Sequence, residues 1–183
     1  FEPKRALDFG CGVGRLTVAM AGRAELVVGC DVSPTMLRHA RENAGGLRNV
    51  EFIESAALGD AGTFDFICSL LVFQHIPPAE GMRFLEVLLQ RLAAGGVAAI
   101  HLTFRRPGGT LLRAARTLRA SSKMVHRLTS LLRRQDPSLP YMQMNAYHRR
   151  RVAAVITRAG CRQLGAIPTR DGDMEGAILI IAR

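Results

Sequence analysis

Residues 6–17, ALDFGCGVGRLT, decide the fold of this chain. They begin as an apolar run around Asp8, open into Gly10, Gly12 and Gly14, and continue into a helix-like pattern. The apolar run suits a buried strand, and the glycines leave a turn without side chains that would keep a ligand from the backbone. A helix that starts here would aim unpaired backbone amides at a bound group. We therefore predict a strand, a ligand-binding turn and the start of a helix.

Asp31 supplies a second part of the same site. It ends the next apolar run, residues 26–30, and follows the glycine turn by about 20 residues, as in nucleotide-binding α/β folds. Open α/β sheets bind ligands at the carboxyl ends of their strands, where this side chain is expected. We predict that its carboxylate accepts hydrogen bonds from both hydroxyls of a ribose.

Two details indicate which nucleotide the turn suits. Arg15 stands where the GxGxxG fingerprint of dinucleotide sites has its third glycine. Asp8 places a carboxylate just before the turn, where it would repel a diphosphate and attract an ammonium or a sulfonium. Both details favour S-adenosylmethionine, whose amino group and methylated sulfur are cationic, over a nicotinamide cofactor.

Four segments, in order, resemble the successive motifs of the class I S-adenosylmethionine-dependent methyltransferases. They are ALDFGCGVGRLT, GCDVSPTML, TFDFICSLLVFQHIPP and LAAGGVAAIHLTF, which cover about residues 4–104, and residues 150–183 match more weakly. The resemblance implies a doubly wound, Rossmann-like α/β fold with helices on both faces of a seven-stranded sheet, six strands parallel and the last antiparallel. It also implies methyl transfer from S-adenosylmethionine, with S-adenosylhomocysteine as the other product.

Further elements follow from periodicity and from glycine and proline positions. We expect helices at residues 15–23, 34–44, 80–92 and 148–159. The third to seventh strands are expected at residues 49–53, 64–69, 97–104, 161–167 and 177–182.

The expected cofactor-binding residues lie at the carboxyl ends of the first four strands. They are Asp8, Gly10, Cys11, Gly12, Gly14, Asp31, Val32, Met36, Ala56, Ala57, Ser69, Leu70 and Gln74. In the resembled family the residue at Met36 packs on the adenine; the alternative is a core methionine.

The adenine contact beyond the third strand departs from the family. Members commonly have an acid where this chain has Ala56. Either a backbone amide near Ala56 and Ala57 holds the adenine, or Glu54 or Asp60 replaces the acid through a shifted loop.

The acceptor side is less defined than the cofactor side. A methyltransferase aligns the nucleophile and excludes water, and it needs a general base only for an acceptor that is protonated when it attacks. The catalytic residues stay open, with His75, Tyr141 and Tyr147 as candidates, and Tyr141, Asn145 and Tyr147 are candidates for acceptor contacts. His75 could instead satisfy backbone groups beneath the site, and the other three could anchor the following insertion to the sheet.

Residues 105–147 form a basic insertion with apolar residues at helical spacing. From Arg105 to Arg151 the chain has twelve Lys or Arg residues and one acid, Asp136, which accounts for the net charge of +10. We predict amphipathic helices that act as a lid over a small-molecule pocket. The alternatives are a nucleic-acid-binding surface, as in an RNA methyltransferase, and attachment to an anionic membrane surface. Aromatic residues for base stacking are sparse on this segment.

Composition and length set the remaining expectations. A chain of 183 residues, 48% of them hydrophobic, can form one domain, residues 1–183. The four cysteines lie singly, which indicates reduced packing residues and no metal site. No apolar run is long enough to span a bilayer, so we expect a soluble protein, and the reduced cysteines favour a cytoplasmic one.

One expectation concerns a segment ahead of the first strand. The first strand begins almost at once, whereas the resembled family usually has a helical segment ahead of it that covers the cofactor, so we expect that this N-terminal cap is missing.

The expected function is methyl transfer to a small-molecule acceptor, and a cofactor-binding module without an acceptor site is the alternative. The oligomeric state stays open.

Overall fold

The computed structural model describes residues 2–105, 144–171 and 174–183. The strands are β1 (Arg5–Phe9), β2 (Leu26–Asp31), β3 (Val50–Glu54), β4 (Phe64–Ser69), β5 (Leu92–Arg105), β6 (Arg162–Asp171) and β7 (Met174–Ala182). The helices are α1 (Arg15–Ala21), α2 (Pro34–Ala44), α3 (Pro78–Gln90) and α6 (Arg149–Arg158), with short 3₁₀ helices η1 (Ser55–Asp60) and η2 (Phe73–His75). Most of the predicted basic insertion, including Tyr141, lies outside the described residues, so its helices and its role as a lid stay predictions.

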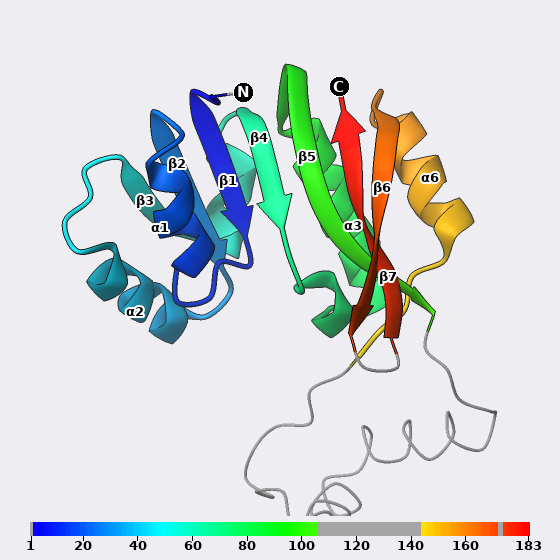
Figure 1. The fold of residues 1–183 in the computed structure, drawn as a ribbon, viewed down its shortest axis with the longest axis horizontal. Helices are drawn as coiled ribbons and strands as arrows, with labels where there is room; N and C mark the ends of the chain where they lie inside the picture. Colours follow the sequence, from blue (N-terminus) through cyan, green and yellow to red (C-terminus); the bar gives the residue numbers. More distant parts are fainter. Residues whose placement is uncertain (1, 106–143, 172–173) are drawn as a thin grey trace, which may run out of the picture.

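The strands form one seven-stranded sheet in the order β3-β2-β1-β4-β5-β7-β6 (Figure 1). Neighbours from β3 to β5 pair in parallel, and β7 is antiparallel to both β5 and β6. This arrangement confirms the predicted doubly wound sheet with six parallel strands and an antiparallel last strand. The chain runs outward from β1 to β3 and then returns to start β4 on the other side of β1. The strand order therefore reverses between β1 and β4, where open α/β sheets bind their ligands.

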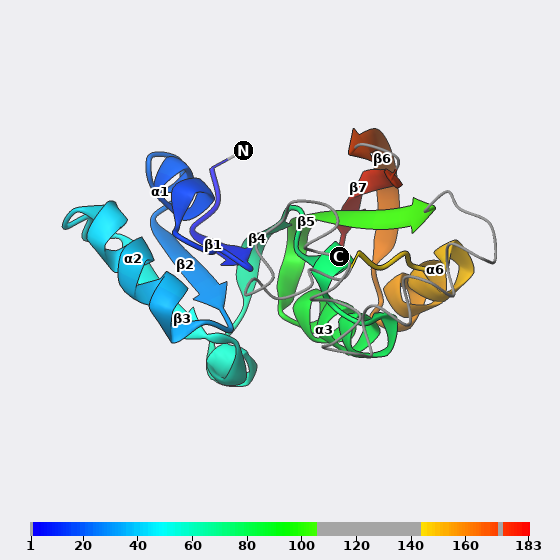
Figure 2. The same ribbon diagram turned by 90° about the horizontal axis from the view of Figure 1, so that it is seen from below.

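Helices cover both faces of the sheet, as Figure 2 shows from the edge. Helices α1 and α2 pack on one face, and α3 and α6 pack on the other. Right-handed crossovers require this split, because the strands advance in opposite directions on the two sides of β1. The central strands are consequently buried on both faces: Ala6, Leu7 and Phe9 of β1 are at most 3% exposed.

Helix α2 begins and ends as its sequence predicts. The Ser33 side chain caps it by accepting a hydrogen bond from the Met36 amide at 3.3 Å, and Pro34 occupies the first turn. Gly45 ends the helix with a φ of 57°, which suits glycine. The helix therefore starts directly after Asp31, at the carboxyl edge of the sheet.

Several element boundaries differ from expectation. Helix α3 ends at Gln90 rather than Leu92, and β5 begins at Leu92 rather than at residue 97, because Leu92 already pairs with Phe64 of β4. The register then shifts, so Gly95 lies in an irregular stretch of this strand instead of a connecting turn. The last two strands are longer than predicted, and Pro168 is tolerated within β6 because β6 is the edge strand of the sheet.

Candidate active site

The glycine turn after β1 is a left-handed bend tied to the end of β2. Gly10, Gly12 and Gly14 have φ values of 77°, 54° and 80°, which other residues adopt only with strain. The backbone amides of Gly10 and Cys11 both donate to the Cys30 carbonyl, at 2.7 and 3.0 Å. The turn therefore has one fixed position at the carboxyl edge of the sheet.

The three glycines serve different purposes. A Cβ at Gly10 would overlap the Val72 side chain, and one at Gly14 would lie 3.1 Å from the Cβ of Ala40 in α2. At Gly12 a Cβ would meet nothing within 4 Å. Gly10 and Gly14 allow close packing within the protein, whereas Gly12 keeps an open approach to the backbone, as expected for a ligand-binding turn.

Asp31 is held in a single orientation at the end of β2. One carboxylate oxygen accepts a hydrogen bond from the Gly12 amide and the other accepts one from the Ser33 amide, both at 2.9 Å. The side chain is half-buried. Each carboxylate oxygen can accept a further hydrogen bond, so two donors, such as the two hydroxyls of a ribose, can still bind.

Asp8 is buried rather than presented to solvent. It is 3% exposed, and Oδ2 accepts a hydrogen bond from the Thr17 hydroxyl at 2.7 Å. Burial raises the pKa of Asp8 above its ordinary value, while the bonds from Thr17 oppose that shift. The electrostatic attraction that we expected from Asp8 and its direct contact with a ligand both stay predictions.

The loop after β4 lies against the glycine turn, since Val72 packs on Gly10. Leu71 in this loop has a φ of 61°, a strained conformation of the kind that is common near functional sites. Ser69 is fully buried and Gln74 is 5% exposed, yet Ser69 Oγ and Gln74 Oε1 have no hydrogen-bond partner within the described residues. Buried polar atoms of this kind need an explanation, and a bound group would supply one.

Several large apolar side chains are exposed around this edge of the sheet. They are Val13, Val32, Met36, Leu70 and Leu71. They lie in α2 or in the connections after β1, β2 and β4. Val32 is 80% exposed and Met36 is 41% exposed, so Met36 is not a core methionine, which favours its predicted contact with an adenine.

The predicted adenine loop is the 3₁₀ helix η1. Leu58 is buried and anchors it, while Ala56, Ala57 and Asp60 are exposed, as is Glu54 at the end of β3. Backbone and carboxylate are thus both accessible, and the choice between them stays a prediction.

Tyr147 is placed as an anchor. Its hydroxyl shares its single proton between the carbonyl oxygens of Phe73 and Ile76, both at 2.9 Å, and the residue is 2% exposed. Burial raises the pKa of Tyr147 above its ordinary value, so the hydroxyl keeps its proton. The geometry favours the structural alternative over the predicted acceptor contact or base.

Asn145 and His75 lie beside Gln74. The Asn145 amide donates to the Gln74 carbonyl at 2.6 Å, and Nε2 of His75 lies 3.3 Å from Nε2 of Gln74. A histidine can act as a general base through either ring nitrogen, so the contact with Gln74 leaves His75 a candidate base.

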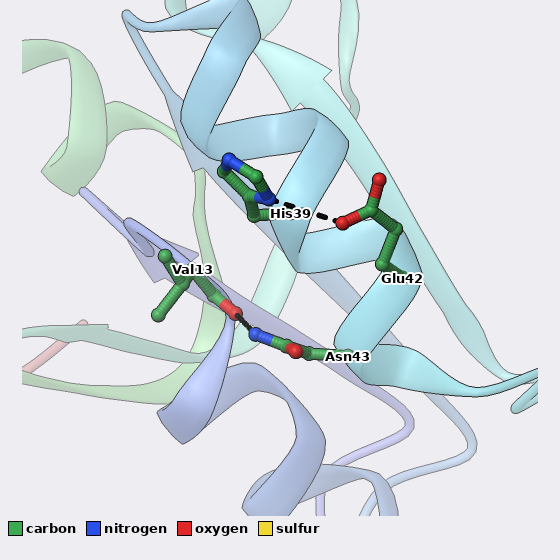
Figure 3. A network of polar contacts seen from close by, with 4 residues as sticks. All are labelled: Val13, His39, Glu42 and Asn43. Carbon is green, nitrogen blue, oxygen red and sulfur yellow. Dashed lines mark hydrogen bonds and ion pairs between the residues drawn. The ribbon is translucent and has the colours of Figure 1, made fainter.

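Asn43 is a residue of the site that the sequence did not indicate. Its side-chain amide, on α2, donates to the Val13 carbonyl of the glycine turn at 2.9 Å (Figure 3). On the same helix, His39 and Glu42 form a separate exposed pair at 3.0 Å. No local pattern distinguishes Asn43 from other polar residues of a helix surface, because its partner is 30 residues away.

The cysteines are free and buried. Burial raises the pKa of Cys11 and Cys68 to about 12 and that of Cys30 to about 11, so these three remain thiols near neutral pH. Across residues 2–105, 144–171 and 174–183, no group of three or more His, Cys, Asp or Glu side chains could hold a metal ion. None of the helices described for this chain is both long and apolar enough to cross a membrane.

The fold and the site define a nucleotide-binding α/β protein, with a glycine turn and a fixed carboxylate at the switch point of a doubly wound sheet. A family model described as a methyltransferase domain matches residues 6–96, which run from β1 into the start of β5. The chain belongs to the class I S-adenosylmethionine-dependent methyltransferase family.

Curated relatives come from several bacteria. The ubiquinone biosynthesis O-methyltransferase of Chelativorans sp. is 35% identical over 140 residues, which are 73% of this chain and 54% of that protein. The trans-aconitate 2-methyltransferase of Streptomyces coelicolor is 34% identical over 171 residues, which are 87% of this chain and 52% of that protein. The chain thus spans about half the length of these relatives.

Solved structures share the fold. A methyltransferase from Methanosarcina mazei has a TM-score of 0.71 at 17% identity, over 99% of this chain and 92% of that one. Magnesium protoporphyrin IX methyltransferase from Synechocystis, solved with S-adenosylhomocysteine, has a TM-score of 0.66 at 20% identity, over 97% and 73%.

Proposed function

We propose that this chain binds S-adenosylmethionine and transfers its methyl group to a small-molecule acceptor. The observation that carries the proposal is the Asp31 carboxylate, held by the Gly12 and Ser33 amides beside an open glycine turn. Family membership and the small-molecule substrates in the names of the curated relatives support it.

The described residues fit this cofactor. Asp31 would hold the ribose, and the exposed side chains of Val32 and Met36 would pack beside the adenine. The open approach at Gly12 would accommodate the methionine end, together with the oxygen atoms of Ser69 and Gln74, for which the described residues offer no hydrogen-bond partner. We retain Cys11, Ala56, Ala57 and Leu70 as further contacts on position alone.

The cofactor supplies an electrophilic methyl group on a positively charged sulfur. The acceptor's lone pair forms the new bond to carbon, and the electron pair of the broken bond stays on sulfur. The protein's task is to align the acceptor and exclude water. If the acceptor is a hydroxyl, its proton must leave, and His75 or Tyr141 is the candidate base.

Three further parts of the proposal extend it beyond the described site. We propose one domain over residues 1–183, with residues 105–147 as the lid. We propose a cytoplasmic location. Nucleic-acid methylation stays the alternative for the basic insertion, and a non-catalytic binding module stays the alternative for the whole chain.

Calorimetric titration with S-adenosylhomocysteine tests the proposal, followed by turnover with a panel of small hydroxyl, carboxyl and amine acceptors. We expect binding of this product and no competition by NADH. Binding of NADH in its place would refute the proposal, and product binding without turnover on the panel or on RNA would favour the non-catalytic module.

A further inference from the structure

Residues 145–147 hold the segment 73–76, which follows the loop after β4. The Asn145 backbone amide donates to the Gln74 carbonyl at 2.6 Å, and the Asn145 side chain approaches the same oxygen at 3.3 Å. The Tyr147 hydroxyl lies 2.9 Å from the carbonyl oxygens of both Phe73 and Ile76 and shares its single proton between them. Three of the four carbonyls of this short segment are therefore held from a part of the chain more than 70 residues away.

Tyr147 is itself rigidly placed. Its backbone amide donates to the Thr103 carbonyl of β5 at 2.7 Å, and its ring packs edge-on against Phe73 at 5.9 Å. Gly81 of α3 makes room for the hydroxyl, since a Cβ at that position would overlap it. Tyr147 thus fixes the segment 73–76 relative to both the sheet and α3.

The segment 73–76 carries a polar group that no residue in the described part of the chain satisfies. Gln74 is 5% exposed, its Nε2 faces His75, and its Oε1 has no hydrogen-bond partner within the described residues. Val72, two residues before Gln74, packs against Gly10 of the glycine turn. An acceptor atom of this kind is costly to bury unless a donor reaches it.

The methionine end of the cofactor has such a donor. Its α-ammonium carries N–H groups, whereas its carboxylate and its sulfonium have none to offer. A carbonyl oxygen beside the glycine turn is therefore suited to the ammonium and not to the carboxylate.

We propose that Tyr147 and Asn145 are positioning residues, which hold the segment 73–76 so that Oε1 of Gln74 accepts a hydrogen bond from the α-ammonium of the cofactor. This inference rests on the proposed function. It assigns Tyr147 and Asn145 to the cofactor side of the site instead of the acceptor side.

A double-mutant cycle tests the inference by calorimetric titration with S-adenosylhomocysteine, which keeps the α-ammonium. Tyr147→Phe removes only the hydroxyl, and Gln74→Met removes the amide at similar volume. We expect each substitution to weaken binding by roughly tenfold and the double variant to be weakened by about as much as either single one, because both act on one contact. Independent losses, which multiply in the double variant, would overturn the inference.

Val155→Ala is the matched control, because Val155 is a buried residue of α6 whose side chain has no polar atom to hold the segment 73–76 by a hydrogen bond. It lowers stability through lost packing alone. We expect it to change the affinity for S-adenosylhomocysteine by less than about twofold at a temperature where all variants are folded. A loss equal to that of Tyr147→Phe would show that the tyrosine acts only through general stability and would overturn the inference.

Two more measurements separate the parts of the proposal. Hydrogen exchange in the absence of ligand should be faster at the His75 and Ile76 amides in Tyr147→Phe than in Val155→Ala, because these amides close the short helix at 2.9 and 3.0 Å. Asn145→Ala should weaken binding by only about two- to threefold, since its backbone amide remains. A wild-type protein that does not bind S-adenosylhomocysteine would refute the proposed function as well; binding with a multiplicative cycle would refute this inference alone.

Discussion

The Asp31 carboxylate accepts a hydrogen bond from the Gly12 backbone amide at 2.9 Å, across the gap between β2 and the turn after β1. This bond joins the two parts of the site that the sequence separates by 19 positions. It also fixes the carboxylate beside the one glycine of the turn that has open space at its Cβ position. Because a preformed acceptor loses little freedom when a ligand binds, the arrangement favours tight recognition of a ribose.

Asp31→Ala should therefore abolish most of the binding of S-adenosylhomocysteine. We expect a loss of roughly 10- to 100-fold, the size of one or two hydrogen bonds to a charged group. Asp31→Asn, which keeps one acceptor oxygen, should lose less. Calorimetric titration measures both affinities, and wild-type affinity in Asp31→Ala would place the ribose elsewhere.

Alanine substitutions at Gly10 and Gly12 should separate folding from binding. Gly10→Ala must fit a methyl group against Val72 at a φ of 77°, so we expect a loss of unfolding free energy on the order of 2 kcal/mol or more. Gly12→Ala introduces only backbone strain, which costs about 1 kcal/mol of unfolding free energy. Its methyl group occupies the open approach, so it should weaken cofactor binding at least about tenfold. Urea unfolding measures the stability of each variant, and calorimetric titration measures its affinity for S-adenosylhomocysteine. Equal destabilisation of both variants would contradict the separate roles of Gly10 in packing and Gly12 in binding.

The buried Asp8 predicts a specific dependence of stability on pH. Its folded-state pKa is raised by burial, so the folded protein binds this proton more tightly than the unfolded chain does. The resulting stability is present below the ordinary pKa of 3.8 and is lost as pH rises through the folded-state value. Asp8→Asn does not titrate, so its melting temperature relative to wild type should increase as pH rises from about 3 to about 7. If the difference in melting temperature between Asp8→Asn and wild type stayed constant over this pH range, Asp8 would not titrate in this way.

Asn43 should affect binding more than stability. It is exposed, so Asn43→Ala should cost less than about 1 kcal/mol of unfolding free energy, yet it releases the Val13 carbonyl and should weaken cofactor binding by roughly two- to fivefold. His39→Ala is the control on the same helix, because the pair it forms with Glu42 does not contact the turn (Figure 3). The test fails if both variants bind alike.

Local patterns were sufficient for much of this protein. The strand and turn around the glycines, the capped helix after Asp31 and the long helix before β5 each depend on residues that are close in sequence. Periodicity and backbone preference report such neighbours directly. Strand boundaries were less well predicted at Leu92 and Pro168, because pairing with a distant strand and an edge position decided them.

The sequence by itself determined the glycine turn and the position of Asp31 at a strand end, because neighbouring residues specify both, and its resemblance to a known family implied the doubly wound sheet. Only the tertiary structure decided that Asp8 is buried against Thr17, that Val72 lies over Gly10, and that Tyr147 holds the segment 73–76. Burial and hydrogen-bond partners depend on which distant segments pack together. The same tyrosine can be an acceptor contact or an anchor until its neighbours are known.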